Sequence, residues 1–593
     1  MKNKLIIFLT VIVLLPSCTD PFELTPTNII SDAVVFDDEG LANAFLADLY
    51  QRSLFLNDAG GTMIDQGLIN SAGGECRNFA PWQRAFGRII GPEFNEQGAG
   101  ILAYYPYELI RECNEFITRI PESASLSDDF KNERVSEARF LRAWAYFRMV
   151  KLYGGVPLIT DVIDVDAPLE ELLRPRNSEK EIYDFIGSEM DAIAPILQSD
   201  PEDGRISKWG ALAFKSRAML YAASVSNFGT QQLDGLLGFP SSEANSYYQQ
   251  SLNASKDIID NGPFSLYRKS NDLVENYSSL FLDEIGNTEI IFKEKFDFEA
   301  NKGHTWDQLG SPFGTGFNWN SNFPVYLQTL ELFDFMDGST GKVDRAIYDG
   351  STPFDPNWYF EQRDPRMRAS IFYPGTSFDG GTVYFHRRTW YTDPADNTRK
   401  SNNQSGFRVP GSDWPGAAPA RHRGGNPTGM LVRKRISEET PDGLNSSSDY
   451  IVFRLAEVML NYVEAAYYLG DPNNDMANIL NNEIRDRVGM PALSGAEITE
   501  DKIRQERRVE LVFEEHAFWD LRRWRIAHLE LHQQIRNRVH WEYDFDDDTY
   551  TGQIAHGDLN RVRLHPEHNY YYALGLGRLA DNSALIENPG YAN

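Results

Sequence analysis

Residues 133–159 read ERVSEARFLRAWAYFRMVKLYGGVPLI, and this stretch predicts one strong helix with a defined end. Apolar side chains recur at three- and four-residue spacing, which places them on one helical face: Val135, Ala138, Leu141, Ala145, Met149 and Leu152. Large residues widen that face: Phe140, Trp144, Phe147 and Val150. We therefore expect burial on more than one side. Gly154, Gly155 and Pro157 should end the helix, because glycine accepts a left-handed cap and proline cannot continue a helix.

Two blocks of sequence resemble one known family. The first block lies in this helix and comprises Glu137-Ala138-Arg139, Leu141-Arg142-Ala143, Tyr146-Phe147 and Tyr153-Gly154-Gly155-Val156-Pro157-Leu158. The second comprises Arg454-Leu455-Ala456-Glu457, Asn461, Glu464-Ala465, Ile484-Arg485, Gly489-Met490-Pro491, Glu506-Arg507-Arg508, Glu510-Leu511, Phe513-Glu514, Asp520-Leu521, Arg523-Trp524 and the tail Asn588-Pro589-Gly590-Tyr591. In this order they resemble the SusD/RagB family, which are surface lipoproteins of glycan-foraging Gram-negative bacteria.

The N-terminus reads as an export signal. Lys2 and Lys4 precede an apolar run from Leu5 to Leu15, which is shorter than the roughly 20 residues of a membrane span. Cys18 follows Pro16-Ser17, as in a bacterial lipobox. We therefore predict a signal peptide over residues 1–17, acylation of Cys18 and a tether over residues 18–30. The alternative is an ordinary secreted protein with a chance cysteine.

Composition excludes some partners. The 593 residues include 86 acidic and 57 basic side chains, giving a net charge of −29. Nucleic-acid phosphates would be repelled, and so would anionic lipid surfaces, so membrane attachment would depend on the lipid alone. Besides Cys18 there are only Cys76 and Cys113, which could pair, but Cys113 lies on an apolar helical face and is predicted to be a buried free thiol.

The pattern along the chain predicts an all-α protein with a long loop-rich insert and minor β-strands. Antiparallel helix pairs with small residues at their contacts favour a tetratricopeptide-like array. Residues 31–593 would form one SusD-like domain, with an N-terminal helical part (31–280), a loop-rich insert (281–448) and a C-terminal helical part (449–593). Helices are expected over 38–56, 105–120, 133–153, from Ser178 and from Ser207, and over 241–259, 450–469, 477–488 and 499–524, with a strand at 289–292.

The charged segment 498–524 could suggest catalysis through Glu514, Glu515, His516 or Asp520. Acid–base catalysis needs two carboxylates with separated pKa values, whereas here carboxylates alternate with arginines. Ion pairing between helices is the better interpretation. His528 and His532 have metal-ligand spacing without a third ligand, and the acidic loop 544–548 lacks the closing glutamate of a calcium loop. We predict no cofactor, no metal and no catalytic residue.

Tryptophans in loop-rich sequence favour a ligand surface: Trp82, Trp306, Trp319, Trp358, Trp390, Trp414 and Trp541. Indole faces stack on sugar rings while nearby polar side chains bind hydroxyls, although any single one could pin a loop instead. The family resemblance implies a site built from 79–84 and 306–320. The predicted ligand-binding residues are Trp82, Arg84, Trp306, Asn318, Trp319 and Asn320, with Trp390 and Trp414 as second choices.

The resemblance implies a lipid-anchored protein on the outside of the outer membrane. It would bind an oligosaccharide and deliver it to a TonB-dependent, SusC-like barrel, leaving hydrolysis to separate enzymes. A second hypothesis is peptide capture, as in RagB-like members. A third is a glycoside hydrolase, which the sequence does not favour because it places no carboxylate pair.

Overall fold

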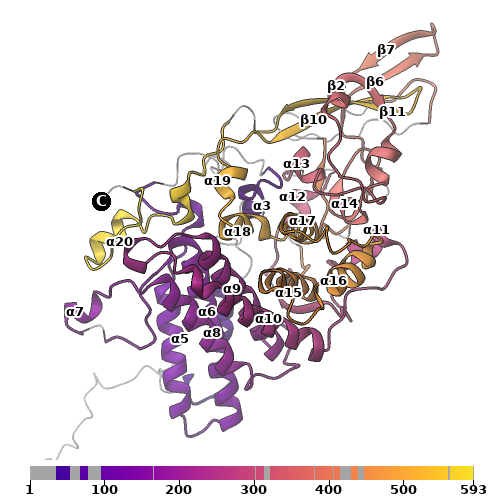
Figure 1. Ribbon diagram of the computed structural model, residues 1–593. Helices are drawn as coiled ribbons and strands as arrows, with labels where there is room; N and C mark the ends of the chain where they lie inside the picture. The colour runs from indigo at the N-terminus through magenta and orange to yellow at the C-terminus, as the bar shows by residue number, and fades with distance from the viewer. Residues whose placement is uncertain are drawn as a thin grey trace, which may run out of the picture.

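The computed structural model describes residues 35–53, 67–77, 95–164, 166–300, 302–312, 321–378, 381–404, 407–413, 429–438, 446–558 and 561–591. A helical body lies at one end and a β-sheet extends from the other, with the β6–β7 hairpin projecting farthest (Figure 1). The buried apolar residues form one large cluster in the helical body and a second cluster beneath the sheet.

Helix α6 (Asp128–Tyr153) contains the stretch that the sequence singled out. Ser127 caps it by accepting a hydrogen bond from the Phe130 N–H, and Asp128 adds a negative charge to the first turn, where the helix dipole favours it. Gly154 ends it with a φ of 73°, a conformation that glycine adopts at little cost. The prediction of a helix buried on several sides and stopped at Gly154 is confirmed.

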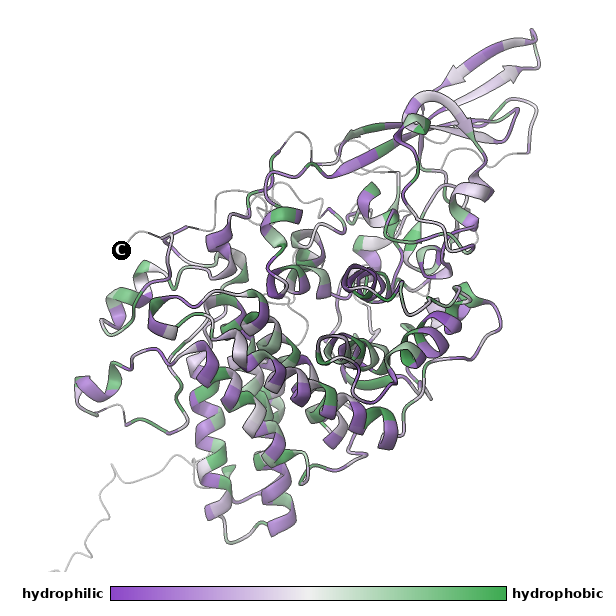
Figure 2. Ribbon diagram, in the orientation of Figure 1, coloured by the Kyte–Doolittle hydropathy of each residue, from purple (hydrophilic) through white to green (hydrophobic). Residues whose placement is uncertain are grey.

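The long helices pack in series, each against the next: α5 (Tyr107–Arg119), α6, α8 (Glu179–Ile193), α9 (Lys208–Phe228), α10 (Ala244–Asn261), α15 (Leu455–Leu469) and α17 (Glu500–Glu510), with α2 (Glu39–Arg52) on α5 and α6. Most of them show hydrophobic and hydrophilic sides in Figure 2, as expected of helices that share a core. Helices begin after Ser178 and Ser207 as expected: Ser207 caps α9, and Ser178 forms a capping box with Glu181 at the start of α8.

A strand replaces the first turn of one predicted helix. Residues Tyr450–Arg454 form β9, which pairs antiparallel with β1 (Ile290–Glu294), and α15 begins only at Leu455. Aromatic and β-branched side chains favour an extended backbone where a partner strand is available. Phe453 of β9 also packs edge-on against Trp144 of α6, at 6.0 Å between ring centroids.

A five-stranded sheet forms from the insert, where the sequence predicted mostly irregular structure, and from residues 537–556 of the predicted C-terminal helical part. Its order is β2 (Asp349–Phe354), β11 (Thr549–His556), β10 (Asn537–Asp544), β6 (His386–Asp393) and β7 (Thr398–Asn402). β10 and β6 run parallel, and the other pairs are antiparallel. Along β10 the buried Val539, Trp541 and Tyr543 alternate with more accessible polar residues, so one face covers the second core. The fold therefore contains more sheet than expected.

The charged segment 499–524 is two helices rather than one. α17 ends at Glu510 and α18 (His516–Arg523) begins six residues later. Between them Phe513 and Glu515 adopt φ angles of 59° and 65°, which an α-helix cannot contain. The break separates the two helices, which remain joined by the ion pair between Arg507 and Asp520 at 2.8 Å.

Shorter elements complete the described part: α3 (Leu68–Ala72), α7 (Leu169–Leu172), α11 (Leu273–Ser279), α12 (Trp306–Gly310), α13 (Leu327–Leu330), α14 (Pro365–Ser370), α16 (Met476–Asn478), α19 (Ala527–Glu530), α20 (Leu576–Asp581), β3 (Ile371–Phe372), β4 (Ser377–Phe378), β5 (Gly381–Thr382) and β8 (Leu431–Val432). Cys76 and Cys113 are both free and buried, which confirms the expectation for Cys113. Within the described ranges no helix combines the length and apolar character needed to cross a bilayer.

Candidate ligand-binding site

The carboxylates of the C-terminal signature lie in a buried ion cluster. Glu510 accepts hydrogen bonds from Arg366 at 2.9 Å and Arg454 at 2.7 Å, and it also pairs with Arg487. Burial alone would raise the pKa of Glu510, but the three guanidinium groups hold it well below its usual value. The pKa of Glu514 is likewise lowered beside Arg454 and Lys434 despite burial. The prediction of structural ion pairing is therefore confirmed.

Trp306, a predicted stacking residue, is packed inside the protein. Its side chain is 2% exposed, and its indole N–H donates to the Lys434 carbonyl at 3.0 Å. Phe323 stacks on the ring at 4.6 Å between centroids, and the Arg435 guanidinium lies 4.7 Å from the ring centroid. The expectation that this indole offers an open face is corrected, because its neighbours already occupy the space a sugar ring would need.

Trp390 lies on β6, on the polar face of the sheet, and is partly exposed. Its indole N–H donates to Glu542 at 2.9 Å, and the guanidinium groups of Arg388 and Arg399 lie 5.4 and 6.0 Å from its ring centroid. Arg399 also pairs with Asp544 and Asp546, the first of the acidic residues that the sequence raised as a calcium loop. These contacts hold the β10–β11 turn against β7.

The remaining predicted residues lie outside the described residues: Cys18, Trp82, Arg84, Asn318, Trp319, Asn320 and Trp414. Backbone that adjoins three of these stretches is nevertheless close together. The Arg77 N–H donates to the Pro324 carbonyl at 2.8 Å, and the Val325 N–H donates to the Met430 carbonyl at 3.1 Å. We call residues 75–77, 323–326 and 430–432 the loop junction, because they pair with one another. Each of them lies within three residues of one of the ranges 78–94, 313–320 and 414–428 in the chain.

Trp358 was named in the sequence but not chosen as a ligand-binding residue. It is 44% exposed and is the most exposed tryptophan of the described part. One ring face stacks on Phe335 at 5.8 Å between centroids. It lies in a π-helical turn, Asn357–Glu361, and periodicity alone gave no signal for which loop tryptophan would be exposed.

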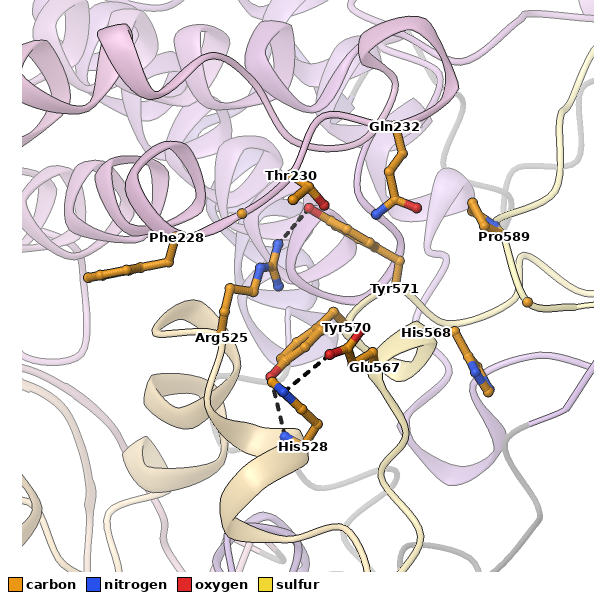
Figure 3. Close-up of a pocket in the computed structure, with 12 residues that line it drawn as sticks. Phe228, Thr230, Gln232, Arg525, His528, Glu567, His568, Tyr570, Tyr571 and Pro589 are labelled. Carbon is orange, nitrogen blue, oxygen red and sulfur yellow. Dashed lines mark hydrogen bonds and ion pairs between the residues drawn. The ribbon is translucent and has the colours of Figure 1, made fainter.

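A cavity of about 470 Å³ lies between the end of α9, the α18–α19 connection and the C-terminal tail (Figure 3). Arg525, His528, Tyr570 and Tyr571 form its inner wall, and Gln232 lies across from them. The sequence did not predict this cavity. Its walls come from four segments that only the fold brings together: 228–232, 525–528, 567–571 and 589–590. Of the two histidines with metal-ligand spacing, His528 lies on α19, which ends at Glu530, before His532.

Hydrogen bonds fix the polar groups of this cavity. The Arg525 guanidinium donates to the Tyr571 hydroxyl at 2.6 Å, and that hydroxyl donates to Glu179 at 2.7 Å. The Tyr570 hydroxyl accepts the His528 backbone N–H at 3.3 Å and also lies 2.6 Å from His528 Nδ1. His528 Nε2 faces Glu567 at 3.2 Å. Among the described residues no group of three or more potential ligands is arranged to hold a metal ion.

Known proteins resemble this chain along most of its length. Residues 288–591 match the sequence model of the SusD family, and residues 93–220 match a model described as starch-binding associating with outer membrane. A SusD-like protein of Bacteroides ovatus is 25% identical over 536 residues, which cover 88% of this chain and 83% of that protein.

Solved structures share the fold. A SusD-like protein from Bacteroides fragilis superposes with a TM-score of 0.70 at 22% identity, covering 95% of this chain and 99% of the other. A SusD-like carbohydrate-binding protein from the same species superposes with a TM-score of 0.66 at 22% identity, covering 93% and 100%. Because the family model spans more than half of the 593 residues, this chain belongs to the SusD family.

Proposed function

We propose that this protein is a surface lipoprotein that binds oligosaccharides and delivers them to a TonB-dependent, SusC-like transporter in the outer membrane. Membership of the SusD family supports it, together with a starch-binding family description and a carbohydrate-binding structural relative. The serial packing of helices from α5 to α17 supports a tetratricopeptide-like array as the scaffold. In this proposal Cys18 carries the lipid, and the protein covers the barrel as a lid.

The loop junction is the observation that carries the proposed site. Three stretches bearing predicted ligand residues adjoin it: 78–94 with Trp82 and Arg84, 313–320 with Trp319 and its flanking asparagines, and 414–428 with Trp414. Loops that leave a rigid body at one place can present their side chains to one ligand. Indole faces would stack on sugar rings, and the guanidinium and amide groups would bind hydroxyls.

Calorimetric titration of residues 19–593 against a panel of polysaccharides, with a peptide mixture as control, tests the proposal. We expect saturable binding to at least one glycan, and a loss of at least about tenfold in affinity, equal to about 1.4 kcal/mol, in Trp82→Ala or Trp319→Ala. Trp358→Ala is the matched control, because it removes an exposed tryptophan that stacks on Phe335. The affinity of Trp358→Ala for the glycan should equal that of the wild type.

Two results would redirect the proposal. Heat from the peptides and none from any glycan would favour the RagB-like, peptide-capturing alternative and reject the ligand class. Release of reducing sugar, abolished by one Glu or Asp substitution, would favour a hydrolase. The anchor is tested separately: Cys18→Ala should abolish palmitate labelling and release the protein from the membrane fraction, and an unchanged membrane fraction would reject the lipid site.

A further inference from the structure

We propose that the cavity between α9, α19 and the C-terminal tail is a second binding site, which takes a monosaccharide-sized ligand through a carboxylate group bound by Arg525. This site lies outside the loop junction and does not depend on the proposed polysaccharide site. The shared chemistry is a planar carboxylate on a small polar body, as in a uronic acid or the C-terminal end of a peptide.

The size of the cavity suits such a ligand. Its volume of about 470 Å³ lies within the range of roughly 300–1,000 Å³ typical of small-molecule sites. Behind it, a second hollow of about 20 Å³ shares Arg525, Tyr570 and Tyr571 with the main cavity. That inner hollow is too small for a ligand group larger than one water. A ligand would therefore end against Arg525 and the two tyrosines.

The inner wall carries two arginines, Arg522 and Arg525, and one buried carboxylate, Glu179, which accepts a hydrogen bond from the Tyr571 hydroxyl and attracts Arg525 without pairing with it directly. Arg525 donates to the Arg522 carbonyl and the Tyr571 hydroxyl, and Arg522 donates to the carbonyls of Asn569, Tyr570 and Lys151. All of these acceptors are neutral, and within the described residues neither arginine forms an ion pair. Arg523, one residue away from Arg522, shows the contrast, because it pairs with Glu464 and Asp520. Two guanidinium groups therefore face one carboxylate, and the remaining positive charge of the wall favours an anion.

The conformation of the Arg525 side chain is restricted, and its guanidinium faces the cavity. Its guanidinium lies 4.7 and 4.9 Å from the ring centroids of Tyr570 and Tyr571, which restricts its rotation. Two of its five N–H groups are used in hydrogen bonds within the described part, and Figure 3 shows the group at the cavity wall beside Tyr571. The backbone φ of 56° at Arg525 is unusual for a residue other than glycine, and such strain recurs at functional sites.

The acidic group of the cavity does not oppose this assignment. Glu567 is 77% exposed at its side chain and is already engaged by His528 Nε2. Solvent screens this exposed carboxylate strongly, whereas Arg522 is buried and Arg525 only partly exposed. A guanidinium binds a carboxylate through two parallel N–H bonds, whereas a neutral sugar offers it only single hydroxyls. The ligand body would face Gln232 and Thr230, whose polar groups can bind hydroxyl or amide groups.

Ligand-observed NMR and calorimetry on residues 19–593 test the proposal. The probes are galacturonate and glucuronate, the matched neutral sugars galactose and glucose, and an N-acetylated dipeptide with a free carboxylate. We expect at least one acidic probe to bind at least tenfold more tightly than its neutral counterpart. Binding only to the uronates would identify an acidic sugar as the source, and binding only to the dipeptide would identify a peptide end.

Variants locate the site. Arg525→Gln should weaken the acidic probe at least tenfold, and Arg525→Lys should weaken it less, because lysine keeps the charge but not the paired N–H bonds. Arg268→Gln removes an exposed arginine that pairs with Asp486 and should change nothing. Thr230→Trp should block binding by filling the cavity while every charge is kept, which covers the case in which Arg525→Gln does not fold.

Two outcomes overturn the proposal: no acidic probe binds, or binding persists unchanged in a folded Arg525→Gln or Thr230→Trp protein. Neither outcome bears on the polysaccharide site, which is tested by Trp82→Ala and Trp319→Ala. Conversely, if the protein binds a uronate at Arg525 but binds no polysaccharide, the proposal of this second site stands and that of the polysaccharide site is rejected.

Discussion

Arg454, at the N-cap of α15, donates to the carboxylate of Glu510, the last residue of α17, at 2.7 Å. Both side chains are buried, and Arg454 also binds Glu289 and Glu514, from the start of β1 and the break after α17. The pair thus joins the C-terminal helices to the strand that opens the insert. Several charges share one buried network, so removing one carboxylate leaves its arginine neighbours with an unbalanced buried charge.

Glu510→Gln should destabilise the protein strongly. The substitution keeps the shape of the side chain but leaves Arg366, Arg454 and Arg487 without the carboxylate that they share. Breaking a buried ion pair from one side costs about 3–5 kcal/mol. Urea unfolding of Glu510→Gln should show this loss, whereas Glu500→Gln, on the more accessible first turn of α17, should change the free energy by less than about 0.5 kcal/mol. Equal effects in the two variants would contradict the cluster's role.

Glu75 should make stability fall as pH rises. Burial raises its pKa from 4.5 to about 8, against the opposing influence of Arg508 and of the Phe513 N–H. The folded state then keeps a proton that the unfolded state releases, so the free energy of unfolding should decrease by about 1.4 kcal/mol per pH unit between 4.5 and 8. Glu75→Gln cannot ionise, and its stability measured by urea unfolding at pH 5, 6 and 7.5 should lack this slope.

The lowered carboxylate pKa values of the ion cluster act in the opposite direction. For Glu506, Glu510 and Glu514 the folded-state pKa lies below the unfolded value of 4.5. Their contribution to stability is therefore present above pH 4.5 and is lost as pH falls below it. Glu510→Gln should lose less free energy of unfolding than the wild type between pH 5 and pH 3. Parallel curves for the two proteins over that range would reject this explanation.

Local chemistry accounts for several helix ends, although the helix expected over 499–524 is broken after Glu510. Ser127, Ser178 and Ser207 supply cap oxygens, and Gly154 supplies a left-handed stop, so these ends are encoded by a few neighbouring residues. The strands were harder, because β9 needs a partner from β1. β6 also needs β10, about 150 residues away, to become part of a sheet. Such pairings leave little trace within either segment alone.

The candidate site was predictable only in part, for the same reason. Trp306 lies in loop-rich sequence, but its burial depends on Phe323 and Arg435, which the fold brings to its two faces. The cavity at Arg525 depends on the C-terminal tail returning to the end of α9. Composition identified tryptophans as ligand candidates, and only the tertiary structure separates packed rings from exposed ones.

Trp306→Ala should lower the stability of the folded protein. Removing a buried indole leaves a cavity beside Phe323 and an unused carbonyl at Lys434, at a cost of about 3–5 kcal/mol. Trp358→Ala removes a ring that is 44% exposed and should cost about 1 kcal/mol or less. The melting temperatures of the two variants test which substitution costs more stability. A Trp306→Ala protein as stable as Trp358→Ala would indicate that the Trp306 ring is exposed and free to bind a ligand.

Cys76 and Cys113 should be unreactive in the folded protein. Both thiols are free and buried, and burial raises the pKa of Cys113 to about 12, so little thiolate exists at neutral pH. A thiol reagent should label neither residue in buffer and both in denaturant, and a reducing agent should leave the melting temperature unchanged. Labelling of neither thiol after denaturation without reductant would point to a disulfide instead.

Gly155, in the turn that ends α6, should not accept a side chain. A Cβ atom there would lie 2.0 Å from the Asn177 carbonyl oxygen and 2.8 Å from the Leu236 carbonyl oxygen. Both are backbone atoms, so the connection between α6 and α8 would have to move, at a cost of about 1–3 kcal/mol or more. Gly155→Ala should therefore lower the melting temperature, while Gly495→Ala, whose Cβ would meet nothing within 4 Å, should leave it unchanged. A Gly155→Ala protein with the melting temperature of the wild type would show that the Tyr-Gly-Gly-Val-Pro turn does not require close backbone packing at this glycine.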